Sequence, residues 1–476
     1  MSKRAVSQQA SAQKRSRKGQ KRKAKAKAKT QGVVTLPVFR PDTAGVDIGA
    51  MEILVAVPPD RDAEPVRSFG TFTRDLEETV AWLESCGITS VAMESTGVYW
   101  IPLYQILVDH KIEVCLVNAR HFHNVPGRKT DVLDCQWLQY LHSVGLLRGS
   151  FRPEQVICAV RTLLRHRQNL VQMAAEHTLH MQKAMEQMNV KLGHVISDIT
   201  GVTGMRIIDA ILQGERDPRA LAQLRDKRIQ AEEETILKSL EGDYRPEHLI
   251  TLEQSLAGYR FYQKQMAELD QKIEGFMEAL PPKIDLREHP LPPDTKKHKR
   301  QHNAPAYDLR TYCYRAFGVD LTEIPGIQAP TAQVLLTEVG PDLSKFPSGS
   351  AFANWVTLCP NNVITGGKIL SAKTRPGKSR AALALRQAAQ TLEHSENHLG
   401  QFFRRMRAKL GRAEAITAVA HKLARIFFAM VRTGQAYDES ALAKADVRQR
   451  AQQEARLRRQ ARQIGFQLVP MEAAQG

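Results

Sequence analysis

The sequence predicts an α/β domain near the N-terminus, then a long helical coiled-coil insert, then a mainly α-helical C-terminal domain. Over residues 33–150, short apolar and β-branched runs alternate with segments of helical period. Residues 154–195 and 251–280 keep a helical period over lengths that are typical of a coiled coil or bundle. A chain of 476 residues is also too long for one ordinary core, so several domains are expected.

The N-terminal domain is expected to follow the order βββαβαβα. Its strands come from the apolar segments VDIGAMEILVAV, VRSFGTF, SVAMEST and EVCLVN. One helix is predicted over residues 74–86 and a second in YWIPLYQILVDH, where Tyr99 and Trp100 are expected to pack in the core. Open α/β sheets place their sites at strand ends, so polar residues there are candidates for function.

The whole chain divides into six predicted segments. They are a disordered basic tail (1–32), the α/β domain (33–150), a helical coiled-coil region (151–280), a proline-rich basic linker (281–305), the C-terminal domain (306–440) and a basic helical tail (441–476). The coiled-coil region is interpreted as an oligomerisation arm for a dimer or tetramer.

Within the C-terminal domain, LTEIPGIQAPTAQVLLTEVG predicts a short helix, a turn at Pro325 and Gly326, and a helix near Pro330. This order is typical of a helix-hairpin-helix, whose amides bind a phosphate without reading bases. A plain helical turn is the alternative.

The charge of the chain favours a polyanionic partner. The formal net charge is +18 and the pI about 9.7. Residues 1–32 alone carry twelve lysines and arginines and no acid, and such a tail binds nucleic acid in a salt-dependent way. It lacks the apolar segment of a signal peptide, and no run of about 18 apolar residues predicts a membrane span. We therefore expect a cytoplasmic protein without membrane contact.

The cysteines do not predict a zinc site. Six are scattered along the chain, and none forms a pair with ligand spacing.

Four carboxylates form the strongest chemical pattern. Asp47 begins the apolar run VDIGAMEILVAV, and Glu94 ends the run SVAME. Asp131 and Asp134 lie three residues apart in a helix-like stretch, so they share one face. Converging carboxylates need cations, and hard oxygen ligands suit Mg²⁺ or Mn²⁺. Two such ions could activate a nucleophile and stabilise the leaving oxygen at a phosphodiester. Lys129 is a candidate for contact with that phosphate, and simple placement on the surface is the alternative.

A second motif lies in LCPNNVITGGKILSAKTRPGKSRAALALRQAAQ. Thr365 directly precedes Gly366, Gly367 and Lys368, and consecutive glycines let backbone amides approach a phosphate. Further donors follow at Arg375, Lys378 and Arg380. A flexible basic loop before a packed helix is the alternative. The segment AKTRPGKS is not a nucleotide-binding P-loop, because it starts with alanine where that motif has glycine and no strand precedes it.

Five segments occur in the order of a known family: VDIG, MESTGVYW, VNARHFHNVPGRKTDVLD, EIPGI…TAQVLL and LCPNN…TGGK…ALRQAA. Over residues 42–440 the chain resembles the DEDD transposases of insertion sequences. The resemblance implies an RNase H-like or RuvC-like N-terminal domain, a C-terminal serine transposase domain, and Asp47, Glu94, Asp131 and Asp134 as metal ligands. It also implies recombination of donor and target DNA, guided by a noncoding bridge RNA.

The family attacks DNA with a serine placed directly before the Gly-Gly pair, and this chain has Thr365 there. The extra methyl group restricts χ1 and crowds in-line attack. Three interpretations stay open: Thr365 is the nucleophile, which we favour; Ser371 replaces it; or this copy is impaired.

Three other functions share part of this pattern. A structure-specific nuclease or junction resolvase would use the carboxylates and water, with Thr365 merely structural. Sugar kinases and actin-type ATPases share the initial Asp-x-Gly strand, but their second phosphate loop and adenosine motif are absent here, and the +18 charge argues against them. A nucleic-acid-binding scaffold with an inactive site is the third.

Overall fold

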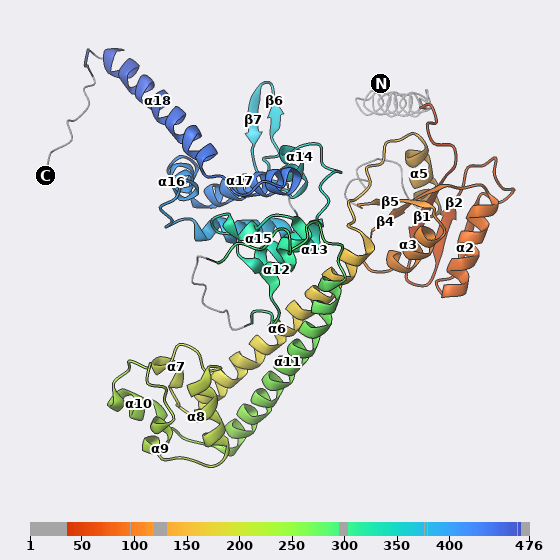
Figure 1. Ribbon diagram of the computed structural model, residues 1–476. Helices are drawn as coiled ribbons and strands as arrows, with labels where there is room; N and C mark the ends of the chain where they lie inside the picture. Colours follow the sequence, from red (N-terminus) through yellow and green to blue (C-terminus); the bar gives the residue numbers. More distant parts are fainter. Residues whose placement is uncertain are drawn as a thin grey trace, which may run out of the picture. The chain divides into compact units, whose positions relative to one another are not determined.

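The computed structural model of the protein describes residues 36–95, 97–118, 131–294, 303–375, 377, 379–463 and 465–467. The chain divides into two compact units, the first ending at Phe151 and the second beginning at Arg152 (Figure 1). Over the described ranges, no helix combines the length and the apolar character that a membrane crossing requires.

The first unit is built on a five-stranded sheet with the strand order β3-β2-β1-β4-β5. The strands are β1 (Thr43–Ile48), β2 (Ile53–Ala56), β3 (Val66–Phe69), β4 (Ser90–Glu94) and β5 (Glu113–Val117). β1, β2 and β3 form an antiparallel meander, whereas β1, β4 and β5 run parallel. With the helices α2 (Thr73–Ser85), α3 (Trp100–Asp109) and α5 (Asp131–Ser143), the order is the predicted βββαβαβα, and the mixed α/β domain is consistent with an RNase H-like fold.

The helices cover the two faces of this sheet differently. α2 and α3 pack on one face, where they form the main core with side chains such as Val46, Val91 and Met93. α5 packs on the opposite face through Leu138 and Leu141 (Figure 1). Alternate residues of each strand therefore face either the α2–α3 core or α5.

The start of α3 corrects one prediction. Trp100 packs against the main core as expected. Tyr99 is 54% exposed, because it is the N-cap residue and precedes the buried face of the helix.

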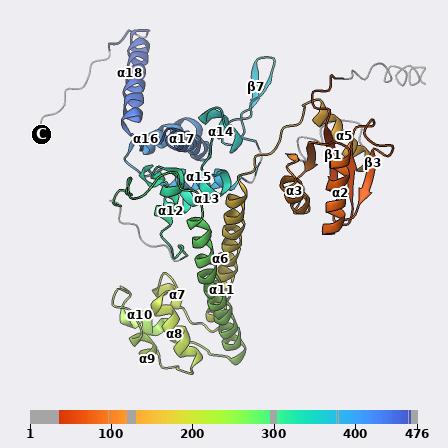
Figure 2. The same ribbon diagram turned by 45° about the vertical axis from the view of Figure 1, so that its right-hand side comes forward.

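The second unit begins with two helices of 33 residues each, α6 (Gln155–Gln187) and α11 (Pro246–Glu278). They lie side by side along their length in both views (Figure 1 and Figure 2). The short helices α7 (Leu192–Val195), α8 (Val202–Leu212), α9 (Pro218–Gln223) and α10 (Glu233–Leu240) connect them. The prediction of one helix to residue 195 was too long, because the chain turns at Asn189, which has a φ of 56°.

The rest of the second unit is mainly helical, as predicted. It contains α12 (Leu309–Phe317), the 3₁₀ helix η2 (Leu321–Glu323), α13 (Ala329–Val339), α14 (Gly349–Trp355), α15 (Arg380–Thr391), α16 (His398–Leu410), α17 (Arg412–Thr433) and α18 (Ser440–Gln463). Its core includes α17, where Phe427 packs against Phe317 and Phe352. Between α14 and α15 the chain forms a two-stranded hairpin from β6 (Val363–Thr365) and β7 (Lys368–Ser371).

Candidate active site

Asp47 and Glu94 lie at the same end of two adjacent parallel strands. Val46 of β1 pairs with Met93 of β4, so the next residue on each strand, Asp47 and Glu94, stands at the same level. Neighbouring strands are about 4.8 Å apart, which places two half-buried carboxylates beside one another. The prediction put Asp47 at the start of a strand, and that detail is wrong. The apolar run is divided by a turn in which the Gly49 amide donates to the Glu52 carbonyl at 2.9 Å, and Asp47 is near the end of the first strand.

Both carboxylates are on the face of the sheet that α5 covers. Val46 and Met93 belong to the core on the other face, so the next residue on each strand, Asp47 or Glu94, faces α5. The partner of Glu94 on the next strand is Val117, which packs with Leu138 of α5.

Gly45 allows α5 to approach this face closely. A Cβ at this position would be 2.2 Å from the Cys135 carbonyl oxygen and 2.4 Å from the Gln139 amide nitrogen, both in the backbone of α5. Only glycine permits this contact between strand and helix. The first turns of α5 are thereby held next to the strand that carries Asp47.

Asp134 comes to the site on α5. Burial raises the pKa of the neighbouring Cys135 thiol to about 11, and the negative charges of Asp47 and Asp134 act in the same direction. Both carboxylates are thus near one thiol. A thiol with this pKa stays protonated near neutral pH, so Cys135 does not provide a thiolate ligand at this edge.

The other predicted members of the site are only partly described. Asp131 is the first residue of α5, one helical turn before Asp134, and its side chain lies outside the described residues. Lys129 lies outside them altogether. Within the described part of the chain, no three His, Cys, Asp or Glu side chains are grouped closely enough to hold a metal ion. The donor set of Asp47, Glu94 and Asp134 is nevertheless all oxygen, which fits a hard divalent cation.

A buried Ser–His pair holds α5 to the sheet, and no sequence motif indicated it. The Ser90 hydroxyl at the start of β4 is 2.8 Å from Nε2 of His142 near the end of α5, and both side chains are buried. Burial lowers the pKa of His142, so the imidazole is neutral in the folded protein. The pair links the strand that ends at Glu94 to the helix that carries Asp134.

The segment around Thr365 is a β-hairpin, which is contrary to the alternative of a flexible basic loop. Gly366 and Gly367 have φ values of 55° and 76° and form a two-residue turn of type I′. Thr365 and Lys368 face one another directly across this turn, and both are exposed. Gly-Gly between the runs VIT and KIL is a hairpin signal that sequence reasoning missed.

The alternative nucleophile, Ser371, lies at the other end of this hairpin. It pairs with Val363 at the base, whereas Thr365 is at the tip. Its hydroxyl accepts a hydrogen bond from the Lys373 amide at 3.4 Å.

Two of the predicted nucleic-acid contacts are engaged within the protein. Arg375 donates to the Asn354 side-chain oxygen at 2.6 Å, and Arg380, the first residue of α15, donates to Oε1 of Gln168. Lys378 lies outside the described residues.

Gly326 has a structural explanation. Its φ is 88°, and a Cβ there would be 2.7 Å from the Ala388 carbonyl oxygen of α15. The turn between η2 and α13 is packed against that helix, so a glycine is required at this position whether or not a phosphate binds.

Comparison with known proteins shows which family the chain resembles. A transposase family model for DEDD transposases of the IS110 type matches residues 44–190. The model "Transposase IS116/IS110/IS902 family" matches residues 320–404. The curated protein "Putative transposase y4pF/y4sB" of Sinorhizobium fredii (strain NBRC 101917 / NGR234) is 34% identical over 130 residues, which is 25% of this chain and 32% of that protein.

The matched ranges contain the elements derived above. The first includes β1, β4 and α5 with Asp47, Glu94 and Asp134, and the second includes the Gly326 turn and the β6–β7 hairpin. Over these two ranges the chain is similar to the IS110 family of DEDD transposases.

Proposed function

We propose that the protein is the recombinase of an insertion sequence, which cuts and rejoins donor and target DNA under the guidance of a noncoding bridge RNA. The observation that supports this best is the alignment of Asp47 and Glu94 at adjacent strand ends, with Asp134 brought to them by α5. Similarity to the IS110 transposase family supports the same activity.

The carboxylates Asp47, Glu94, Asp131 and Asp134 would hold Mg²⁺ or Mn²⁺. When bound, such ions supply a lowered pKa for the attacking hydroxyl and neutralise charge at the scissile phosphate. The contact at Gly45 and the Ser90–His142 bond keep β1, β4 and α5 at fixed spacing, so the ligands are positioned before substrate arrives.

Thr365 is proposed as the nucleophile. Its hydroxyl is exposed at the hairpin tip, and the two glycines beside it present no side chain that would obstruct a DNA backbone. Attack would form an Oγ1–phosphorus bond, break one phosphorus–oxygen bond to a deoxyribose, and transfer the hydroxyl proton to the released sugar oxygen. The ester conserves the bond energy, so a second DNA hydroxyl can displace Thr365 without ATP.

The remaining predicted contacts complete this proposal. The turn at Gly326, interpreted as part of a helix-hairpin-helix, would contact the nucleic-acid backbone. The same backbone would be contacted by Lys129, Gly366, Gly367, Lys368, Arg375, Lys378 and Arg380. The α6–α11 pair would serve as the coiled-coil arm of a homodimer or tetramer. The basic α18 would bind DNA or RNA in the cytoplasm, at the nucleoid.

Covalent trapping tests the proposal directly. Purified protein would be incubated with Mg²⁺, the noncoding RNA of its own element and end-labelled donor and target DNA, then run on a denaturing gel. We expect an adduct in wild type and in Ser371→Ala, at least a hundredfold less in Asp47→Asn, and none in Thr365→Ala. Thr365→Ser should restore it, because only the methyl group is removed. An adduct that persists in Thr365→Ala would reject this nucleophile.

A hydrolytic nuclease is the second candidate, favoured by the threonine at the position of the family's serine. It would cleave DNA with the same carboxylates and form no adduct. Cleavage retained in Thr365→Ala and lost in Asp47→Asn would establish this alternative.

A further inference from the structure

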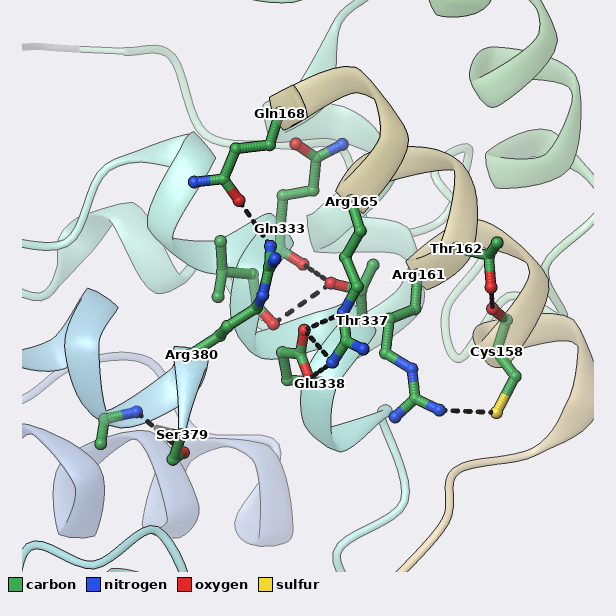
Figure 3. Close-up of polar contacts among 12 residues, drawn as sticks. Cys158, Arg161, Thr162, Arg165, Gln168, Gln333, Thr337, Glu338, Ser379 and Arg380 are labelled. Atoms are coloured by element: carbon green, nitrogen blue, oxygen red, sulfur yellow. Dashed lines mark hydrogen bonds and ion pairs between the residues drawn. The ribbon is translucent and has the colours of Figure 1, made fainter. Parts of the chain in front are cut away.

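A groove in the second unit is lined neither by the carboxylates of the candidate site nor by any residue of the β6–β7 hairpin. It has a volume of about 440 Å³ and is bounded by α6, α13 and α15. Figure 3 shows α6 contributing Arg161, Arg165 and Gln168, and Arg380 reaching toward the same part of α13. Arg380 was predicted to contact nucleic acid, but the α6 residues opposite it were not.

The groove is strongly positive. Its lining contains four guanidinium groups, those of Arg161, Arg165, Arg167 and Arg380, and one carboxylate, that of Glu338. The formal charge is therefore +4 − 1 = +3. Arg167 is neutralised by Asp270 behind the groove at 3.0 Å, which leaves +2.

Arg165 and Arg380 are held in place but keep donor capacity. Arg165 binds Glu338 through Nε at 3.1 Å and Nη2 at 2.7 Å, while its side chain stays 44% exposed. Arg380 uses Nη1 toward Gln168. Each guanidinium has five N–H donors in a planar fork, so both can also bind a phosphate. Two preordered donors cost a ligand less entropy than two free side chains.

The other walls of the groove suit a base. Leu383 is 54% exposed, and with Val334 and Leu164 it forms an apolar surface against which a flat ring can lie. The exposed amides of Gln168 and Gln387 both donate and accept, as the edges of bases do. A volume of this size accepts a small ligand, and a base reaches such a surface only when it is unpaired.

We propose that this groove binds a single-stranded nucleic-acid segment, with one backbone phosphate between Arg165 and Arg380 and the adjacent base against Leu383. The choice of nucleic acid as ligand rests on the proposed function, because a transposase handles unpaired strands. Single-stranded DNA and RNA share the required chemistry, and the experiment separates them.

Fluorescence anisotropy would measure the binding of labelled single-stranded DNA and RNA to the full chain at several salt concentrations. Arg165→Gln combined with Glu338→Gln removes both members of the ion pair, so no carboxylate is left without its partner. We expect this double variant and Arg380→Gln each to weaken binding about tenfold or more and to reduce the salt slope by about 0.7. Glu338→Gln alone should tighten binding, because it removes the competing negative charge.

The matched control is Arg260→Gln combined with Asp209→Asn. This pair joins α11 to α8 at 2.6 Å and its arginine is 54% exposed, close to the value for Arg165, but it lies outside the groove. It should leave both affinity and salt slope unchanged. Groove variants that bind like this control, or a wild type without affinity for single strands, would overturn the proposal.

Photocrosslinking locates the base. Oligonucleotides carrying 4-thiothymidine or 4-thiouridine should crosslink to peptides of α6, α13 or α15, and crosslinks confined to other elements would contradict the assignment. Failure of the recombinase proposal would instead appear as absence of the covalent DNA adduct in wild type, which is independent of this binding result.

Discussion

Replacing Gly45 by alanine tests whether close packing of α5 on β1 holds the candidate site together. The new Cβ would be 2.2 Å from the Cys135 carbonyl oxygen, and ordinary contact begins at 3.4 Å, so the helix must move by about 1.2 Å (3.4 − 2.2). The opposing atoms belong to the backbone and cannot rotate away. Overpacking of this kind costs about 1–3 kcal/mol, which corresponds to a decrease in Tm of roughly 3–10 °C.

The same shift would displace Asp134 relative to Asp47. A misplacement of about 1 Å can reduce a catalysed rate about a hundredfold, so adduct formation should fall by that order while the protein remains folded below its Tm. Thermal unfolding by circular dichroism and the trapping gel measure the two effects. Gly275→Ala is the control: this glycine is inside α11, nothing lies within 4 Å of its added Cβ, and alanine should stabilise by up to about 1 kcal/mol. A Gly45→Ala protein with unchanged Tm and activity would refute the reasoning.

Three further predictions concern other features of the fold. Burial lowers the pKa of His142 below 6.5, so as the pH falls below about 6.5 the unfolded chain binds a proton that the folded protein does not. The free energy of unfolding should then decrease by up to about 1.4 kcal/mol per pH unit. Chemical denaturation of His142→Asn should show a weaker dependence of this free energy on pH. Asp270→Asn leaves the buried Arg167 guanidinium without its counter-charge and should cost about 3–5 kcal/mol, whereas a protein with Asp270→Leu and Arg167→Met together should recover most of this in urea unfolding. Valine at Gly366 or Gly367 would require a β-branched residue at positive φ, so hydrogen exchange in β6 and β7 should accelerate while the Tm of the domain changes by less than about 1 °C.

Local patterns accounted for the element types. Apolar runs of four to six residues became the strands of the sheet, and the helical period became α2, α3, α6 and α11. Asp47 and Glu94 could be recognised as candidates because each is an acidic residue at one end of an apolar run. The boundary errors at Asp47 and Asn189 arose where a short turn interrupts a continuous pattern. The hairpin at Gly366 and Gly367 was also encoded locally, and its turn signal was overlooked.

The candidate site shows what a linear pattern omits. Nothing near Gly45 in the sequence indicates that its α-carbon touches a helix about ninety residues later, and nothing marks Ser90 and His142, which are 52 positions apart, as a hydrogen-bonded pair. Gly326 illustrates the converse. This glycine was expected to belong to a phosphate-binding turn, yet packing against α15 already requires glycine there.

By itself, the sequence determined the strand and helix order and the strongly positive net charge, and it indicated the resemblance to the transposase family, because each depends on composition, on periodicity over a few residues or on the order of short motifs. The tertiary structure alone decided which carboxylates face one helix and which arginines share a groove. Arg380 and Gln168 are 212 positions apart, and their contact exists only because α6, α13 and α15 pack together. Such contacts follow from the close packing of whole elements, which is a property of the folded chain and has no local signature.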